Sequence, residues 1–528
     1  MPSLSLPEPR RTPPLETLTQ YEAVQLFVER ARAAAAPFDP DPSERPLLRE
    51  ICDRLDRLPL AIELAAPRTR ALSLEALHER LIQRLPLLTG GPRDLPARQQ
   101  TLEATLAWSH DLLSTPEQRA FRRLSVLAGP FTPEAAEAVA GTDVVTLEAL
   151  LEQNLMTRHE TGRLTLLETV REYALERLAD SGEEDTVRAR HARCMLEIAR
   201  SANVTIEAEG PMRHDLVIGE RTNVTAALDW ARDSGHTKLG LELAAILENY
   251  WVTNDPLEGR RRLGELLGAA DGAPSSLHAH ALRAYASAGI MLGEYDDAKR
   301  DYERSLAEYR AVGDTRGVAI MLQRLAVEEL RRDHVESART LAEESLTLNR
   351  AIGFAKGEAV ALGVVANIAS AEGDDDHALE LLAQSADLCA RIGFPWWHVR
   401  VLAAISDLLR RRDSVDEADA KMREALPLLE QMGDRPGSIF ALAQLASFAA
   451  HADNAERAGR LWGAIEAEQI RNPYADWETI RARFEPAQLV GGAAFDIGRK
   501  NGQHLTLDQA IEFAYADDNR ASAANSNP

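Results

Sequence analysis

The second half of the chain repeats a pattern of hydrophobic and small residues every 40 positions. Four columns keep this step in one register, which indicates a repeat array. The columns are Leu282, Leu322, Leu362, Leu402 and Leu442; Ala286, Ala326, Ala366, Ser406 and Ala446; Ala298, Ala338, Ala378, Ala418 and Ala458; and Gly313, Gly353, Gly393 and Gly433.

Each repeat is predicted to be a pair of helices. The Leu and the small residue stand four apart and therefore share one face of a first helix. The recurring Ala marks where a second helix must approach closely, and the Gly supplies the left-handed conformation that ends that helix. Such a pair leaves an apolar face for its neighbour to cover, so residues 274–470 are expected to stack into an α-solenoid.

The pattern differs in residues 101–180, where short helices precede two short strands. The stretches STPE (114–117) and TPE (132–134) place a hydroxyl and a proline at helix starts, and Thr146 is the expected N-cap of a helix over 147–154. The segment LMTRHETGRLTLLETV (155–170) predicts a hairpin with Glu160-Thr161-Gly162 as its turn. Helices followed by a small hairpin indicate a winged helix.

The remaining segments complete an all-α fold class with this single winged helix. Two helical regions are expected, a module over 16–95 that is interrupted at Pro59 and a connector over 186–273. The Gly- and Pro-rich stretch over 89–100 is the expected linker between the first module and the winged helix. Residues 471–515 are expected to cap the array. We expect a flexible terminus at 1–15 and a disordered polar tail at 516–528.

Composition narrows the function classes. The chain has 528 residues, enough for several domains, and 60 basic against 83 acidic residues give it a net charge of −23. This charge repels phosphate backbones, and the candidate recognition helix LEALLEQN (147–154) has no basic residue, so no direct nucleic-acid binding is expected. Three cysteines without a CxxC pair, no export signal and no membrane-length apolar stretch predict a cytoplasmic protein with reduced thiols.

The Leu, small and Ala columns resemble the tetratricopeptide repeat, whose usual period is about 34 residues. The resemblance implies that the first helices line a groove for a protein or peptide ligand. The basic stretches ELRRDH (329–334) and LLRRRDS (408–414) either complement helix C-termini or form a strip that meets an acidic partner. The expected groove residues are Gln323, Arg331, Asn367, Trp396, Asp407, Arg411, Ser447 and His451.

The first half carries a further resemblance. RLDRLPLAIELAAPRTRAL, LPARQQTLEATLAWSHDLL, EQRAFRRLSVLAGPFTPEAAEAV and RLTLLETVREYALERL occur in the order seen in bacterial NB-ARC-like (STAND-class) ATPases. Those proteins are large transcriptional regulators of the LuxR and AfsR types. The resemblance covers roughly residues 15–515, and implies the C-terminal portion of such a regulator: a helical domain, a winged helix and a tetratricopeptide sensor array.

The nucleotide site of that family is only partly represented. Pro59 matches the proline that lies against the nucleotide base, but Arg57 replaces the glycine of that motif and Leu167 replaces a histidine near the wing. No GxxxxGK[ST] occurs, so a phosphate-binding lysine and a magnesium-binding hydroxyl are missing. We expect no enzyme activity, no metal site and no cofactor. ATP or ADP would bind only with a core encoded upstream or supplied in trans. A shortened relative or a reading frame that starts inside a longer gene would explain the pattern.

Three functions are compatible with these observations. The leading hypothesis is a non-catalytic regulatory or scaffold protein whose solenoid binds a protein or peptide in bacterial transcriptional control. An alternative is one part of a STAND ATP-dependent switch whose nucleotide core lies upstream or in another chain. A third is a homo-oligomerisation module that inhibits full-length relatives. No membrane partner is expected.

Overall fold

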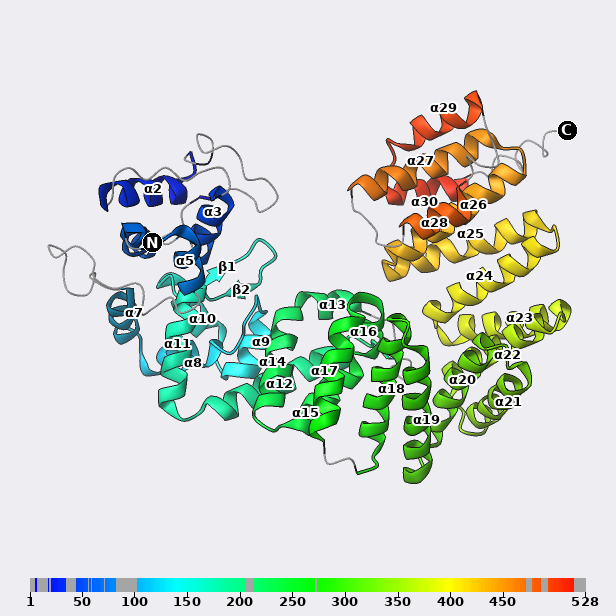
Figure 1. The fold of residues 1–528 in the computed structure, drawn as a ribbon, viewed down its shortest axis with the longest axis horizontal. Coiled ribbons are helices and arrows are strands. Elements are labelled where there is room, and N and C mark those ends of the chain that lie inside the picture. The colour runs from blue at the N-terminus through cyan, green and yellow to red at the C-terminus, as the bar shows by residue number, and fades with distance from the viewer. Residues whose placement is uncertain are drawn as a thin grey trace. The chain divides into compact units, whose positions relative to one another are not determined.

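The computed structural model describes residues 5–6, 18, 20–34, 44–55, 57, 59–70, 72–81, 102–205, 213–270, 273–471, 477–485 and 492–516. Within these ranges the secondary structure is helical apart from one two-stranded hairpin, which confirms the all-α prediction (Figure 1). The chain divides into two compact units, Met1–Ile198 with Leu216–Leu243 and Ala199–Asp215 with Ala244–Pro528. The predicted linker over 89–100, most of the predicted flexible terminus and the predicted tail after 516 lie outside the described residues.

The first unit begins with short helices around an apolar core. Phe27, Ile51 and Ile62 are fully buried in it. Arg57, in the turn before Pro59, has a left-handed φ of 57°, a conformation that glycine adopts most readily. The elements are α2 (Glu22–Ala34), α3 (Arg45–Arg54), α4 (Pro59–Ala65), the 3-10 helix η1 (Ala66–Arg70), α5 (Leu74–Arg80) and α7 (Leu102–Asp111).

The predicted hairpin of the winged helix is confirmed, with Thr157 paired to Thr165 in an antiparallel register. Ser114 and Glu117 form a capping box, as the sequence indicates. The expected N-cap Thr146 is wrong: Asp143 caps this helix, because its carboxylate accepts the Thr146 N–H at 2.8 Å. The elements are α8 (Thr115–Leu124), α9 (Pro133–Ala140), α10 (Val144–Glu152), β1 (Thr157–Arg158), β2 (Leu164–Thr165) and α11 (Glu168–Ser181).

Helices without a strong repeat follow the winged helix. In the first unit, the buried Asn223 side chain accepts the Gly129 N–H at 2.9 Å and donates to the Pro130 carbonyl at 3.2 Å. This side chain therefore fixes α14 against the loop after α8. The elements are α12 (Glu184–Ser201), α13 (His214–Gly219), α14 (Arg221–Asp233), α15 (Thr237–Ile246), α16 (Glu248–Asn254) and α17 (Pro256–Ala269).

Five helical hairpins follow in the second unit, and they keep the predicted register. Every Leu and Ala of the four columns is buried, and the four glycines end the second helices with φ between 63° and 73°. Ser406, which replaces Ala in one column, donates to the Ala418 carbonyl at 2.8 Å, so its buried hydroxyl is satisfied. The helices are α18 (Ser276–Met291), α19 (Tyr295–Val312), α20 (Thr315–Arg331), α21 (Val335–Ala351), α22 (Ala355–Ala371), α23 (Asp375–Ile392), α24 (Pro395–Arg411), α25 (Val415–Met432), α26 (Arg435–His451) and α27 (Ala455–Arg471).

The first helices end at a fifth column of residues with the 40-residue step, which the sequence analysis does not predict. Its members have left-handed φ values between 54° and 86°. The next N–H in each case donates back to a carbonyl near the end of the helix, as His334 does to Glu329 at 2.9 Å. A search for Gly or Asp at the 40-residue step would have found them. They are Gly293, Asp333, Gly373, Asp413 and Asp453.

Replacing each of two glycines in the second unit by alanine is expected to change the free energy of unfolding in opposite directions. Gly353 has a φ of 68° and open space where a Cβ would lie, so Gly353→Ala is expected to cost about 1 kcal/mol through backbone conformation alone. Gly268 also has open space but lies within α17 at an ordinary φ, so Gly268→Ala should stabilise by up to about 1 kcal/mol. Urea unfolding of both variants measures the difference. Equal shifts would contradict the assigned conformations.

The array ends in three short helices, α28 (Trp477–Phe484), α29 (Ala493–Gly502) and α30 (Leu507–Ala516). Helix α29 packs directly on α27, because glycines allow backbone contact. A Cβ on Gly459 or Gly463 would lie 2.1 Å from a carbonyl oxygen of α29, and a Cβ on Gly498 or Gly502 would lie 2.0 Å from one of α27. Ile511 of α30 is buried in the same core as the last repeat, so α29 and α30 cover the end of the array.

Candidate protein-interaction surface

The first helices carry two columns of residues that also keep the 40-residue step. The columns are four residues apart and therefore lie on one face of each helix. We call these ten positions the first-helix strip. They are Ser287, Val327, Asn367, Asp407 and Ser447, and Met291, Arg331, Ala371, Arg411 and His451.

The second column of the strip is exposed throughout, whereas the first column is exposed in its middle and buried at both ends. Met291 and Val327 are 56% and 45% exposed, which is unusual for apolar side chains, and Asn367 and Arg411 are also exposed. Ser287 is buried at one end. The middle repeats therefore present both apolar and charged groups to solvent.

Two predicted groove residues need correction. Gln323 and Ser447 are 3% and 9% exposed, because neighbouring helices cover them. Gln323 lies four residues before Val327, on the part of α20 that packs inward, and its buried Oε1 has no hydrogen-bond partner among the described residues. His451 remains exposed, and its Nδ1 lies 2.8 Å from the Ser447 carbonyl.

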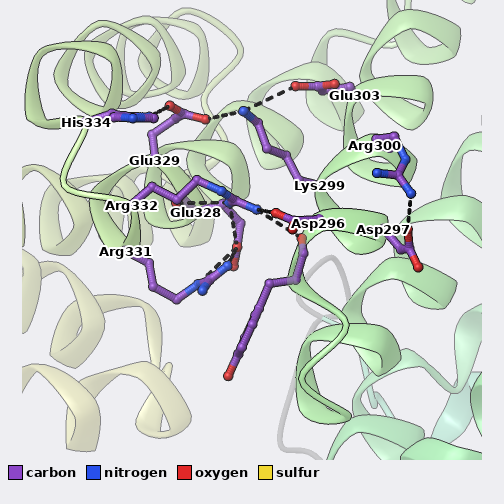
Figure 2. A network of polar contacts seen from close by, with 11 residues as sticks. Asp296, Asp297, Lys299, Arg300, Glu303, Glu328, Glu329, Arg331, Arg332 and His334 are labelled. Atoms are coloured by element: carbon purple, nitrogen blue, oxygen red, sulfur yellow. Dashed lines mark hydrogen bonds and ion pairs between the residues drawn. The ribbon is translucent and has the colours of Figure 1, made fainter.

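Arg331 is held in a defined position by its neighbours. Its guanidinium lies 3.6 Å from the centroid of the Tyr295 ring and donates to Glu328 at 2.7 Å. Figure 2 shows Arg331 and Arg332 both turned toward Glu328, with Arg332 also reaching Asp296, at 2.8 Å. The cation is therefore ordered, while its side chain stays 37% exposed.

A second part of this network joins consecutive repeats. Lys299 of α19 contacts Glu329 of α20 at 2.7 Å, and His334 lies 2.8 Å from the other oxygen of that carboxylate (Figure 2). Burial raises the pKa of Glu329, but the hydrogen bonds from Lys299 and His334 outweigh it and hold the pKa below its ordinary value. The carboxylate thus stays charged and fixes the end of α20 against α19.

The same arrangement recurs 80 residues later. Arg412 contacts Asp376 at 2.7 Å, as Arg332 contacts Asp296. Arg411 donates to the Ser370 hydroxyl at 2.7 Å and lies 3.5 Å from Asp375, which occupies the position equivalent to Tyr295. Arg331 and Arg411 are therefore equivalent, partly exposed cations at the ends of two first helices. The structure brings them onto one strip, as the sequence indicates.

The two tryptophans at the start of α24 differ. Trp397 donates its indole N–H to the Ala359 carbonyl at 3.0 Å and packs where Gly363 leaves space, so it belongs to the core. Trp396 is only partly buried and lies under the Arg400 guanidinium, 3.9 Å from the ring centroid. Both rings are partly buried and pack against the same core. Because the hydrogen bond fixes Trp397, Trp396 is the better candidate for a ligand contact.

The first end of the strip is filled by a carboxylate from outside the repeats. Glu248 of α16 is 3% exposed, and receives hydrogen bonds from Arg283 at 2.9 Å and from Ser287 at 2.8 Å. Arg324 of the next repeat lies 3.0 Å from the same carboxylate. Burial raises the pKa of Glu248, but Arg283 and Arg324 more than offset it and hold the pKa well below the ordinary value. Sequence patterns within the repeats could not reveal this partner.

The residues assigned to a nucleotide site lie in the first unit. Pro59 is the first residue of α4. Leu167, at the position of the family's histidine, is the N-cap residue of α11. Both positions lie at the start of a helix. The role of Pro59 in nucleotide binding therefore rests on the family resemblance alone. Among the described helices, none has the length and hydropathy of a membrane span.

No family model matches the chain. It is 40% identical over 240 residues to a candidate HTH-type transcriptional regulator of Mycobacterium bovis, covering 44% of this chain and 27% of that protein. It is 28% identical over 351 residues to the regulatory protein AfsR of Streptomyces coelicolor, covering 62% of this chain and 32% of AfsR. These similarities confirm the resemblance to large bacterial regulators. The chain spans less than a third of the length of both relatives.

Solved structures show weaker similarity. A STAND protein with a tetratricopeptide repeat sensor from Pyrococcus horikoshii is 15% identical, with a TM-score of 0.44 over 96% of this chain and 74% of that one. Aspartyl phosphate phosphatase F from Bacillus subtilis is 13% identical, with a TM-score of 0.41 over 83% of this chain and 96% of that one. Both TM-scores are too low to establish a common fold.

Proposed function

We propose that this chain is a non-catalytic regulatory protein of bacterial transcriptional control, whose repeat array binds an acidic stretch of a protein partner on the first-helix strip. The observation that carries the proposal is the pair of equivalent cations, Arg331 and Arg411, ordered at matching positions with part of each side chain exposed. A chain of net charge −23 repels acidic partners in general. Two partly exposed guanidinium groups on one strip give such a partner a preferred place, although each also lies near a carboxylate of this chain.

The middle of the strip also offers apolar area. Val327 is exposed four residues before Arg331 on α20, and Met291 is exposed at the equivalent end of α18. Trp396 is partly buried at the start of α24, the helix that ends at Arg411. Partner-binding surfaces gain most of their affinity from aromatic, apolar and arginine side chains that lose water on binding. The similarity to regulators supports a role in transcriptional control. Because GxxxxGK[ST] is missing from the sequence, we propose this role without a nucleotide cofactor.

A pull-down with the full chain tests the proposal. The variant R331E/R411E reverses two charges on the strip, and is expected to reduce recovery of the partner from a lysate of the source bacterium at least tenfold. The control R300E/R304E makes the same charge change on α19, at side chains that are 67% and 63% exposed and off the strip. Equal recovery with both double variants would refute an acidic partner on the strip.

A further inference from the structure

Helix α28 covers the last part of the face that carries the first-helix strip. Its Phe484 ring meets the Phe440 ring of α26 edge to face, with centroids 5.1 Å apart. The Arg483 guanidinium lies 3.9 Å from the Asp407 carboxylate of α24 and near both phenylalanine rings. Asp407 is a member of the strip, and Phe440 lies seven residues before Ser447 on the same face of α26. A segment of this chain therefore occupies a predicted partner position.

Three helices pack on the end of the array, and Ile480 and Phe484 of α28 belong to the core of the last repeat. Helix α29 packs on α27 through backbone contact at the glycines, and α30 shares the core of the last repeat. Those two helices cover the end of the array, where an uncovered apolar face would otherwise remain. Helix α28 instead reaches across α26 to α24, one repeat further back. The position of α28 is therefore set by its contacts with this face of α26 and α24.

Helix α28 is attached by an apolar stripe and by one ion pair. The helix has eight residues, too few to be stable alone in water, so its contacts with the array hold it. Trp477, Ile480 and Phe484 form its apolar stripe, with Trp477 near Trp462 of α27. Its one ion pair to the strip is long, and both side chains are well exposed, at 58% and 39%. Displacing α28 uncovers apolar side chains, since Ile480 and Phe484 are 6% and 8% exposed, so only an occupant with a similar apolar stripe can replace it.

We propose that the face formed by Asp407 and Phe440 is a binding site for an amphipathic helix that presents an arginine next to an aromatic residue, and that α28 is its internal occupant. A partner helix with this Arg–aromatic pair replaces α28, with its cation on Asp407 and its ring on Phe440. This proposal does not rest on the acidic partner, because it concerns a carboxylate, Asp407, one turn before Arg411 on α24.

Fluorescence anisotropy with the full chain and a labelled peptide of residues 474–487 tests it. In the wild-type chain the internal helix competes, so binding is expected to be weak. Phe484→Ala weakens the internal helix and should tighten peptide binding at least tenfold. Arg483→Glu, which changes only an exposed side chain, should tighten it about threefold. Phe484→Ala combined with Phe440→Ala should lose the gain, because the receiving ring is gone.

The outcomes are distinct. Tighter binding by both single variants, lost when Phe440 is also replaced, supports the site. If neither single variant binds the peptide more tightly than wild type, α28 is a fixed part of the fold and the proposal is overturned. A gain that survives Phe440→Ala also overturns it, since the peptide then binds elsewhere. Hydrogen exchange in α26, unchanged in Arg483→Glu, excludes a general loosening of the last repeat.

Discussion

Replacing Gly463 by valine is expected to destabilise the second unit by about 3 kcal/mol, because there is no space for a side chain between α27 and α29. A Cβ at this position would lie 2.1 Å from the Arg499 carbonyl oxygen, and a backbone atom cannot move aside as a flexible side chain can. The two helices must separate, which exposes apolar surface on both. Urea unfolding gives the free energy, and hydrogen exchange in α29 shows where the structure opens.

The matched control is Gly268→Val. Gly268 also lies in a helix of the second unit, but a Cβ there meets no atom within 4 Å. The helix propensities of Gly and Val differ little, so its free energy of unfolding should stay within about 0.5 kcal/mol of wild type. If Gly463→Val unfolds at the same urea concentration as this control, the close backbone packing of α27 and α29 is wrong.

Replacing Glu248 by alanine is expected to cost about 3–5 kcal/mol, because it leaves the Arg283 guanidinium buried without its carboxylate. The Arg283 side chain has no exposed area, and it lies 2.8 Å from Glu248. The matched control is Glu303→Ala on α19, whose carboxylate is 54% exposed and 3.7 Å from Lys299, and which should cost only a few tenths of a kcal/mol. Chemical denaturation at neutral pH compares the two variants. Equal, small losses would show that the buried cluster contributes nothing.

The loss at Glu248 should also depend on pH. Its pKa in the folded chain lies well below the ordinary glutamate value, so the folded state favours the charged form. Its contribution is therefore complete above the pKa of the unfolded chain and decreases as the pH falls through the folded pKa. The difference between wild type and Glu248→Ala should be constant near neutral pH and narrow in acid. A difference that widens in acid would contradict this sign.

Most of the repeat architecture could be predicted, because its determinants recur. The Leu and Ala columns place the buried faces, and Gly353 and its equivalents place the helix ends. The left-handed position of Asp333 is harder to predict, because aspartate replaces glycine at three of the five positions of that column. Buried Ser305, Ser345 and Ser385, whose hydroxyls each donate to a carbonyl 26 residues earlier at 2.7 Å, also follow the period. They link the two helices of the first three repeats, and in the sequence they stand out only as small residues.

The candidate surface was less predictable, because the burial of its residues depends on contacts with segments that lie outside the 40-residue repeats. Arg331 and Arg411 could be placed from the repeat alone. The burial of Ser287 depends on Glu248 from the connector, and the contact on Asp407 depends on Arg483 from the terminal helices. Gln323 was wrongly predicted to line the groove, because two residues one turn apart on the same face of a helix can differ, one being buried and the other exposed. Periodicity gives the face of a residue, but not what covers it.

Cross-linking from the strip tests the central claim most directly. A photoreactive benzoylphenylalanine at Val327, which is exposed four residues before Arg331 on α20, should trap the partner, and R331E/R411E in the same chain should abolish the adduct. The same group at Ser337, an exposed position on the second helix α21, should trap none. An adduct from Ser337 but not from Val327, or one from Val327 unaffected by the charge reversal, would contradict a partner on the first-helix strip.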